Sequence, residues 1–175
     1  MNKKLLLFLI LVIGLLSGLY FFSKNPSPSF GFNSYCAFCD SSVIERQKFY
    51  EDELVVALYI HKPIFPGHCL IIPKRHIERF EMLTDVEIAK MGKAIKKVNQ
   101  AVKKVYGTSS YLLYQKNGRE VGQSVPHVHF HYLPRKTGDD STLKFIIRMY
   151  IANAKQPISS EDMQEAIEKL REAIE

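Results

Sequence analysis

The sequence of 175 residues contains no tryptophan, only three cysteines and no internal repeat. Three cysteines are too few for a disulfide framework in a chain of this length. Apart from a short Ser/Pro tract near the start, no stretch has the polar, low-complexity composition that is typical of disorder. The 46% of apolar residues can fill an ordinary core, and the length suits one globular domain plus a tail or anchor.

The charge balance is basic, with a formal net charge of +6. Such a balance favours anionic partners, although it says nothing about the fold. Many of the lysines fall within one predicted helix, over 85–106, and charge runs of this kind usually form a solvated face. We therefore expect no nucleic-acid partner, and a lipid or nucleic-acid contact through these lysines is the alternative.

An uncharged apolar run extends from Leu5 to Phe22, directly after Lys3 and Lys4. As a helix it would span about 27 Å, just enough to cross a hydrocarbon core of about 30 Å. The apolar region of a cleaved signal peptide is usually shorter, and the small residues around Ser17 lack the spacing of a cleavage site. The sequence therefore predicts a single-pass membrane anchor over 1–22, with a cleaved signal as the alternative.

The segment 23–34, with Pro26 and Pro28, is predicted to be an extended linker to a domain over 35–175. Lys3 and Lys4 precede the apolar run and only Lys24 closely follows it, so the positive-inside rule gives a small bias. That bias predicts a membrane-anchored domain on the non-cytoplasmic side, with the N-terminal helix as its contact with the membrane.

Apolar runs separated by turn residues predict strands over 54–60, 69–72, 111–115 and 126–133. Thr84 and Glu87 have the pattern of a capping box, and apolar residues then recur every three or four positions up to Gly107. A last helix is expected from about Ser159. This order predicts an α+β fold: an antiparallel meander sheet with one long inserted helix and a C-terminal helix. The apolar stripe of the long helix could pack on the sheet or on a second subunit, which leaves a homodimer open.

His127, His129 and His131 alternate with apolar residues. Because side chains on a strand alternate between its two faces, the three imidazoles are expected on one face. Two chemical interpretations follow from that arrangement. The imidazoles could bind one metal ion, or one could attack phosphorus while its neighbours hold the phosphate oxygens.

Residues 122–131, Gly-Gln-Ser-Val-Pro-His-Val-His-Phe-His, resemble the signature of the histidine-triad (HIT) family. The block at 66–76, from Pro-Gly-His to Pro-Lys-Arg-His, is similar to a second motif of that family. The Cys36-x-x-Cys39 pair resembles its zinc-bearing bacterial branch. The likeness covers about 35–175, nearly all of the predicted domain, and implies the HIT-like form of the fold.

The resemblance implies catalytic roles. His129 would be the nucleophile on the α-phosphorus of a nucleotide or nucleotide conjugate, and would form a nucleotidyl-histidine intermediate. His131, Gln123 and Ser124 would hold phosphate oxygens, and His68 would lie near the leaving group and assist proton transfer. Substrates of this chemistry are a nucleoside phosphoramidate, a dinucleoside polyphosphate or an adenylylated group. The alternatives are nucleotidyl transfer to a phosphate acceptor, and a non-catalytic zinc-stabilised nucleotide-binding or scaffold module.

The resemblance also implies a structural zinc ion. Its ligands would be Cys36, Cys39, His76 and His127, a Cys2His2 set that suits tetrahedral zinc. A disulfide between Cys36 and Cys39, or two free thiols, are the alternatives. Cys69 lies among apolar residues and is expected to be a small core residue.

Two positions depart from the family pattern. Ile60 stands where members usually have an Asp that holds the ribose hydroxyls, and His61 and Lys62 follow it. Lys116 stands where an Asn often lines the same pocket, with Asn117 next to it. Lys116 and Asn117 are therefore the expected substrate-binding residues, and the nucleoside-binding set is altered while the catalytic set is retained.

Overall fold

The computed structural model describes residues 35–139 and 141–174, together with positions 6, 8, 10, 12–14, 16 and 17. The chain divides into two units, 1–34 and 35–175. The second unit contains the sheet and every site residue predicted above. The predicted linker over 23–34, and most of the apolar run before it, lie outside the described residues.

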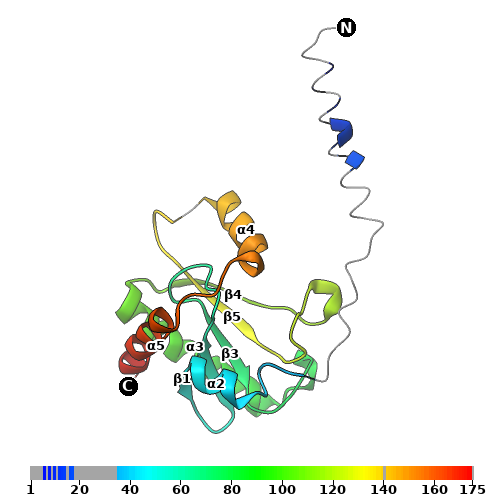
Figure 1. The fold of residues 1–175 in the computed structure, drawn as a ribbon. Coiled ribbons are helices and arrows are strands. Elements are labelled where there is room, and N and C mark those ends of the chain that lie inside the picture. The colour runs from blue at the N-terminus through cyan, green and yellow to red at the C-terminus, as the bar shows by residue number, and fades with distance from the viewer. Residues whose placement is uncertain are drawn as a thin grey trace. The chain divides into compact units, whose positions relative to one another are not determined.

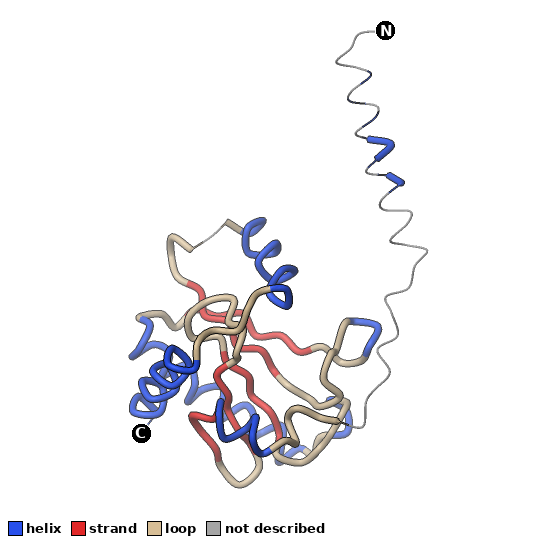
Figure 2. Tube along the Cα trace, viewed as in Figure 1, coloured by secondary structure: helices blue, strands red, loops and turns tan. Residues whose placement is uncertain are grey.

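The second unit is built on a five-stranded antiparallel sheet with the strand order β1-β2-β3-β5-β4. Its strands are β1 (Lys48–Glu51), β2 (Val55–Tyr59), β3 (Cys69–Pro73), β4 (Ser110–Gln115) and β5 (Phe130–Arg135). The first three form a meander. The long helix intervenes before β4, and β5 then returns between β3 and β4, as Figures 1 and 2 show. The predicted α+β fold with an antiparallel sheet is confirmed.

Four helices of this unit accompany the sheet: α2 (Ser41–Gln47), α3 (Asp85–Tyr106), α4 (Thr142–Ile151) and α5 (Ser160–Ile174). Short 3-10 turns occur at η1 (Phe80–Met82), η2 (Arg119–Val121) and η3 (Ala152–Ala154). The long inserted helix and the C-terminal helix were predicted. Helices α2 and α4 were not, because α2 is only seven residues long and the apolar side chains of α4 are largely exposed.

Helix α3 begins and ends where its sequence predicts. The Thr84 side chain accepts from the amide of Glu87, and the Glu87 carboxylate accepts from the amide of Thr84, so both free amides are satisfied. Gly107 ends the helix with φ +71°, a conformation that costs glycine little. Its buried face includes Met91, Val98 and the small Ala94 and Ala101, which pack with α5 and one face of the sheet. The predicted stripe therefore packs on the sheet.

The other face of the sheet carries a second, smaller apolar cluster. Val56 and Leu58 of β2 and Leu70 and Ile72 of β3 form it, and Phe38, Ile44 and Ile60 pack against it. Leu70 pairs with His131 across β3 and β5. Because directly paired residues share a face, this register places His131 on the α2 side of the sheet and Tyr132 in the larger core beneath α3.

The prediction of membrane localisation through an N-terminal anchor is wrong. Among the residues that the structure describes, no helix is both long and apolar enough to cross a membrane. Helix α3 has 22 residues, but it carries charged lysines along its length. Helix α4 is apolar but has only 10 residues, about half of the roughly 20 that a span requires.

A candidate active site beside a candidate metal site

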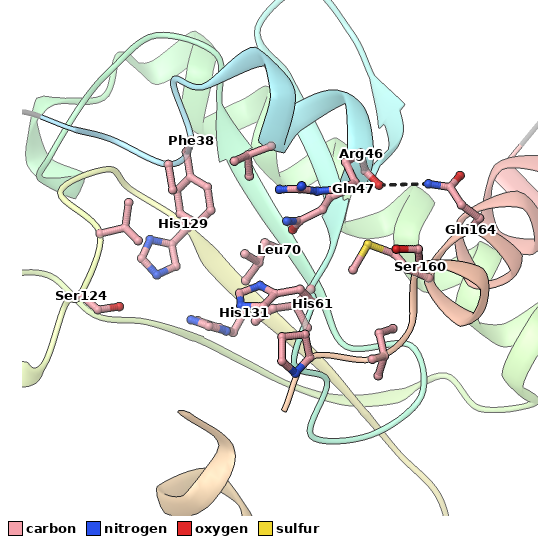
Figure 3. A pocket seen from close by; sticks show the side chains of 17 residues that line it. Phe38, Arg46, Gln47, His61, Leu70, Ser124, His129, His131, Ser160 and Gln164 are labelled. Carbon is pink, nitrogen blue, oxygen red and sulfur yellow. Dashed lines mark hydrogen bonds between the residues drawn. The ribbon is translucent and has the colours of Figure 1, made fainter. Parts of the chain in front are cut away.

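The three triad histidines lie together at the start of β5. Regular strand hydrogen bonding begins at Phe130 rather than at the predicted Pro126, yet the alternation already holds upstream: Val128 is buried in the larger core. His129 and His131 line a pocket of about 520 Å³ with Ser124 (Figure 3). The rings of His129 and His131 are in edge-to-face contact, with their centroids 5.1 Å apart.

The tautomer of His129 follows from its hydrogen bond. Its Nδ1 lies 2.7 Å from the carbonyl oxygen of His127, and a carbonyl can only accept, so Nδ1 carries the proton. The residue is 4% exposed, and burial lowers the pKa of its imidazole. Phe38, on the loop before α2, packs edge-on against the ring with a centroid separation of 5.2 Å. His129 is thus a fixed, neutral imidazole with a lone pair on Nε2, which is what a nitrogen nucleophile requires.

A second chain of hydrogen bonds fixes His131. The amide of Ile64 donates to Nδ1 of His68 at 3.2 Å, so His68 carries its proton on Nε2. That Nε2–H donates to Nδ1 of His131 at 3.0 Å, which leaves His131 with its proton on Nε2. Burial lowers the pKa of His68 to about 3 and is the main cause that lowers that of His131 to about 2. Tyr114 stacks on His131 at 4.5 Å. His131 is therefore a neutral hydrogen-bond donor through Nε2.

His68 was expected near the leaving group. The structure buries it to 2% exposure, and it does not line the pocket. Its imidazole instead lies behind His131 and sets that residue's tautomer.

The predicted phosphate-binding residues differ in what their side chains contact. Ser124 lines the pocket. The Gln123 side chain accepts from the amide of Gly118 at 2.6 Å and donates to the carbonyls of Glu78 and Val125. Both ends of that amide are occupied by backbone groups, so Gln123 shapes the loop that presents Ser124.

Lys116 and Asn117 also differ in what their side chains interact with. The side chain of Asn117 accepts from the amide of Phe80 and donates to Glu81, each at 2.8 Å, which ties it to η1. Lys116 faces the triad electrostatically, since its positive charge contributes to lowering the pKa values of both His129 and His131. Of the two, Lys116 is the one whose charge acts on His129 and His131.

Four predicted metal ligands converge on one point. One ligand atom from each of Cys36, Cys39, His76 and His127 lies within 4.8 Å of the others. Cys36 Sγ is 3.5 Å from Nδ1 of His127, and Cys39 Sγ is 3.3 Å from Nδ1 of His76. Zinc bonds of about 2.0–2.3 Å in a tetrahedron separate ligand atoms by about 3.3–3.8 Å. Both cysteines are free thiols. The donor set and its spacing therefore fit zinc.

The hydrogen bonds of His127 suit a metal ligand. Its Nε2 lies 2.9 Å from the carbonyl oxygen of Pro73, so Nε2 carries the proton and the Nδ1 lone pair faces the two thiols. A backbone partner of this kind fixes the ring of a ligating histidine. The carbonyl of the same residue accepts from His129. His127 therefore belongs to the cluster through its ring and holds the candidate nucleophile through its carbonyl.

The model of the HIT domain family matches residues 41–138, more than half of the chain. The chain belongs to the HIT family.

An uncharacterised HIT-like protein of Methanocaldococcus jannaschii is 41% identical over 112 residues, which cover 63% of this chain and 86% of that protein. The asymmetrical bis(5′-nucleosyl)-tetraphosphatase of Schizosaccharomyces pombe is 41% identical over 98 residues, 56% of this chain and 54% of the relative. This chain thus spans about half the length of that enzyme.

A further relative and two solved structures are also similar to this chain. The bis(5′-adenosyl)-triphosphatase of Dictyostelium discoideum is 32% identical over 131 residues, 75% of this chain and 87% of the enzyme. Among solved structures, a hypothetical histidine triad nucleotide-binding protein of Sulfolobus tokodaii has a TM-score of 0.64 at 28% identity and covers 79% of this chain and 91% of its own. A zinc-bound family member from Mycobacterium smegmatis, 23% identical with a TM-score of 0.62, covers 79% and 92% and shares the fold.

Proposed function

We propose that this protein is a nucleotide hydrolase that acts at an α-phosphorus through a nucleotidyl-histidine intermediate on His129. The observation that carries the proposal is the buried, neutral His129, whose Nδ1–H donates to a backbone carbonyl and whose Nε2 is free to attack. Two relatives, named as a bis(5′-nucleosyl)-tetraphosphatase and a bis(5′-adenosyl)-triphosphatase, support hydrolysis of a nucleotide as the general reaction.

Two steps account for the reaction. Nε2 of His129 forms a bond to the α-phosphorus, and the leaving group departs with the electron pair of its own bond to phosphorus. The phosphorylated ring then bears a positive charge, which the Nδ1–H bond to the carbonyl of His127 stabilises. Water attacks the same phosphorus and loses its proton to the solvent. The P–N bond breaks, and its electrons return to Nε2, which restores neutral His129 and releases a nucleoside monophosphate.

The remaining pocket residues would act on the phosphate oxygens. His131, protonated on Nε2, and the Ser124 hydroxyl can each donate a hydrogen bond to the charge that grows in the transition state. The ammonium of Lys116 would add a positive charge, where the family pattern has a neutral amide. Positioned donors of this kind cost no reorganisation during the reaction.

We further propose that the four-residue cluster holds one structural zinc ion. With four protein ligands the site would be closed, and the metal would supply stability rather than a step at phosphorus. It would join the loop before α2 and the loop after β3 to His127, and so fix the carbonyl on which the His129 tautomer depends.

Hydrolysis of adenosine 5′-phosphoramidate and of a dinucleoside tetraphosphate tests the proposed function. Wild-type protein should release adenosine 5′-monophosphate, and His129→Asn should lower kcat by a thousandfold or more, roughly, as loss of a nucleophile does. His129→Asn should keep its zinc and melting temperature. Product analysis with added inorganic phosphate distinguishes water from a phosphate acceptor. Binding without turnover of any of these compounds would replace the hydrolase with a nucleotide-binding module.

A further inference from the structure

The pocket beside the triad extends well beyond the reacting histidines. Its 520 Å³ is within the range of about 300–1,000 Å³ that is typical of small-molecule sites. Ser124 and His129 lie at one end, and the side chains of Arg46 and Gln47 enter from α2 at the other (Figure 3). If an α-phosphorus sits at His129, this second end receives the nucleoside.

Among the described residues, the lining of that second end contains no carboxylate. None of the described residues that border the pocket is Asp or Glu. Ile60, at the position where the family pattern predicts a diol-binding Asp, packs instead on the apolar cluster with Leu70. A ribose with two free hydroxyls would therefore meet no anionic acceptor here.

The same end of the pocket is lined by a cationic side chain and an imidazole instead. Arg46 lies in the last turn of α2, and no carboxylate among the described residues forms an ion pair with its guanidinium. His61 follows Ile60 and borders the same pocket. An unpaired guanidinium at a pocket wall is a strong site for a phosphate group, because it offers several N–H donors in a planar fork.

Gln47 provides an independent observation. The residue is 5% exposed, it lines the pocket, and no described group forms a hydrogen bond with its side-chain amide. Buried polar side chains almost always have a partner, so one left open at a pocket wall indicates a ligand or solvent group in contact with it. Its amide NH₂ can donate to an anion that Arg46 neutralises.

From this juxtaposition we propose that the pocket selects nucleotides that carry a second phosphate on the ribose, held by Arg46 and Gln47 with His61 beside them. The inference rests on the proposed function, since it takes the α-phosphorus to lie at His129. A substrate class of nucleoside 5′-conjugates with a 3′- or 2′-phosphate would satisfy the open donors and would need no ribose carboxylate. With an unphosphorylated ribose, the donors of Arg46 and Gln47 would contact water instead.

The test compares kcat/KM for adenosine 5′-phosphosulfate with kcat/KM for its 3′-phosphorylated and 2′-phosphorylated forms. One of the phosphorylated forms should be preferred by about 10- to 100-fold, the value of one or two charge-assisted hydrogen bonds. Arg46→Ala should bring this ratio close to one, and Arg46→Lys should restore part of it. Lys93→Ala, which removes an equal charge from an exposed residue outside the pocket, is the matched control and should leave the ratio unchanged.

A second variant tests the sugar contact from the other direction. Ile60→Asp should lower the preference for the phosphorylated form, since a carboxylate repels phosphate and accepts from a diol. Calorimetric binding of adenosine 3′,5′-bisphosphate and 2′,5′-bisphosphate, against adenosine 5′-monophosphate, separates the two proposals. Tighter binding of a bisphosphate without turnover would overturn the hydrolase and support the subsite. Turnover with equal kcat/KM for all three substrates would overturn the subsite and leave the hydrolase standing.

Discussion

Removal of zinc from the proposed site at Cys36, Cys39, His76 and His127 should destabilise the folded domain by at least about 4 kcal/mol. A metal that joins Cys39 to His76 closes a loop of 37 residues, and one that joins Cys36 to His127 closes a loop of 91 residues. The chain-entropy relation for cross-links gives about 4 kcal/mol for the first loop and about 5 kcal/mol for the second. A single ion closes both loops, so the two values cannot be added together. For a domain of this size the loss corresponds to a fall in Tm of about 10–15 °C.

The assay is thermal unfolding followed by circular dichroism, under reducing conditions, with and without a zinc chelator. The wild-type protein should contain one zinc per chain and lose stability on chelation, whereas Cys36→Ser should bind little zinc and show no further effect of chelator. Cys69→Ala is the matched control, because this buried cysteine lies outside the cluster and should keep the chelator response. Equal Tm values with and without chelator would refute the reasoning, as would a loss of two free thiols without bound zinc.

The remaining predictions concern three residues around the pocket, namely His68, Lys116 and His127. The pKa of His68 is near 3 in the folded protein and near 6.5 when unfolded, so only the unfolded chain takes up this proton between those pH values. His68 alone should therefore lower stability by about 1.4 kcal/mol per pH unit below 6.5, and the total slope should be steeper because burial also lowers the pKa values of His129 and His131. His68→Gln should reduce the slope by about that contribution in denaturant titrations at pH 6.5, 5.5 and 4.5. Lys116→Ala should lower kcat/KM by about a hundredfold with nucleoside phosphoramidate, whereas Lys93→Ala should not; equal effects would refute a local role. His127→Ala should lose zinc and Tm together with activity, and full activity in zinc-free His127→Ala would contradict the link between cluster and nucleophile.

Much of the fold was predictable because its elements have strong local patterns. The capping box at Thr84, the αL glycine at Gly107 and the continuous apolar runs of β2 and β3 each determine a boundary or a buried strand. Helix α2 was missed although Asp40 caps it, because seven residues carry too little periodicity. The apolar run at the N-terminus was interpreted as an anchor from its length, its lack of charge and the lysines before it, and the localisation predicted from it was wrong.

The site was predictable in its residue types but not in its contacts. The resemblance to the HIT family implied four metal-binding residues, and the structure brings their side chains together. Gln123 was expected on phosphate oxygens, yet backbone groups occupy its amide, because a loop conformation decides where such a side chain donates. Phe38, which packs on His129, carried a signal only as an apolar residue between the two cysteines. Arg46 and Gln47 carried none, since they reach the pocket through the unpredicted α2.

Detection of a covalent intermediate shows whether His129 is the nucleophile. Wild-type protein would be mixed with adenosine 5′-phosphoramidate, quenched within milliseconds to seconds, and analysed by intact mass and peptide mapping under alkaline conditions that preserve phosphohistidine. We expect a mass increase of one adenylyl group, located on His129, that rises and then decays as product forms. We expect no adduct in His129→Asn. Turnover at the wild-type rate by His129→Asn, or an adduct on any other residue, would contradict that role of His129.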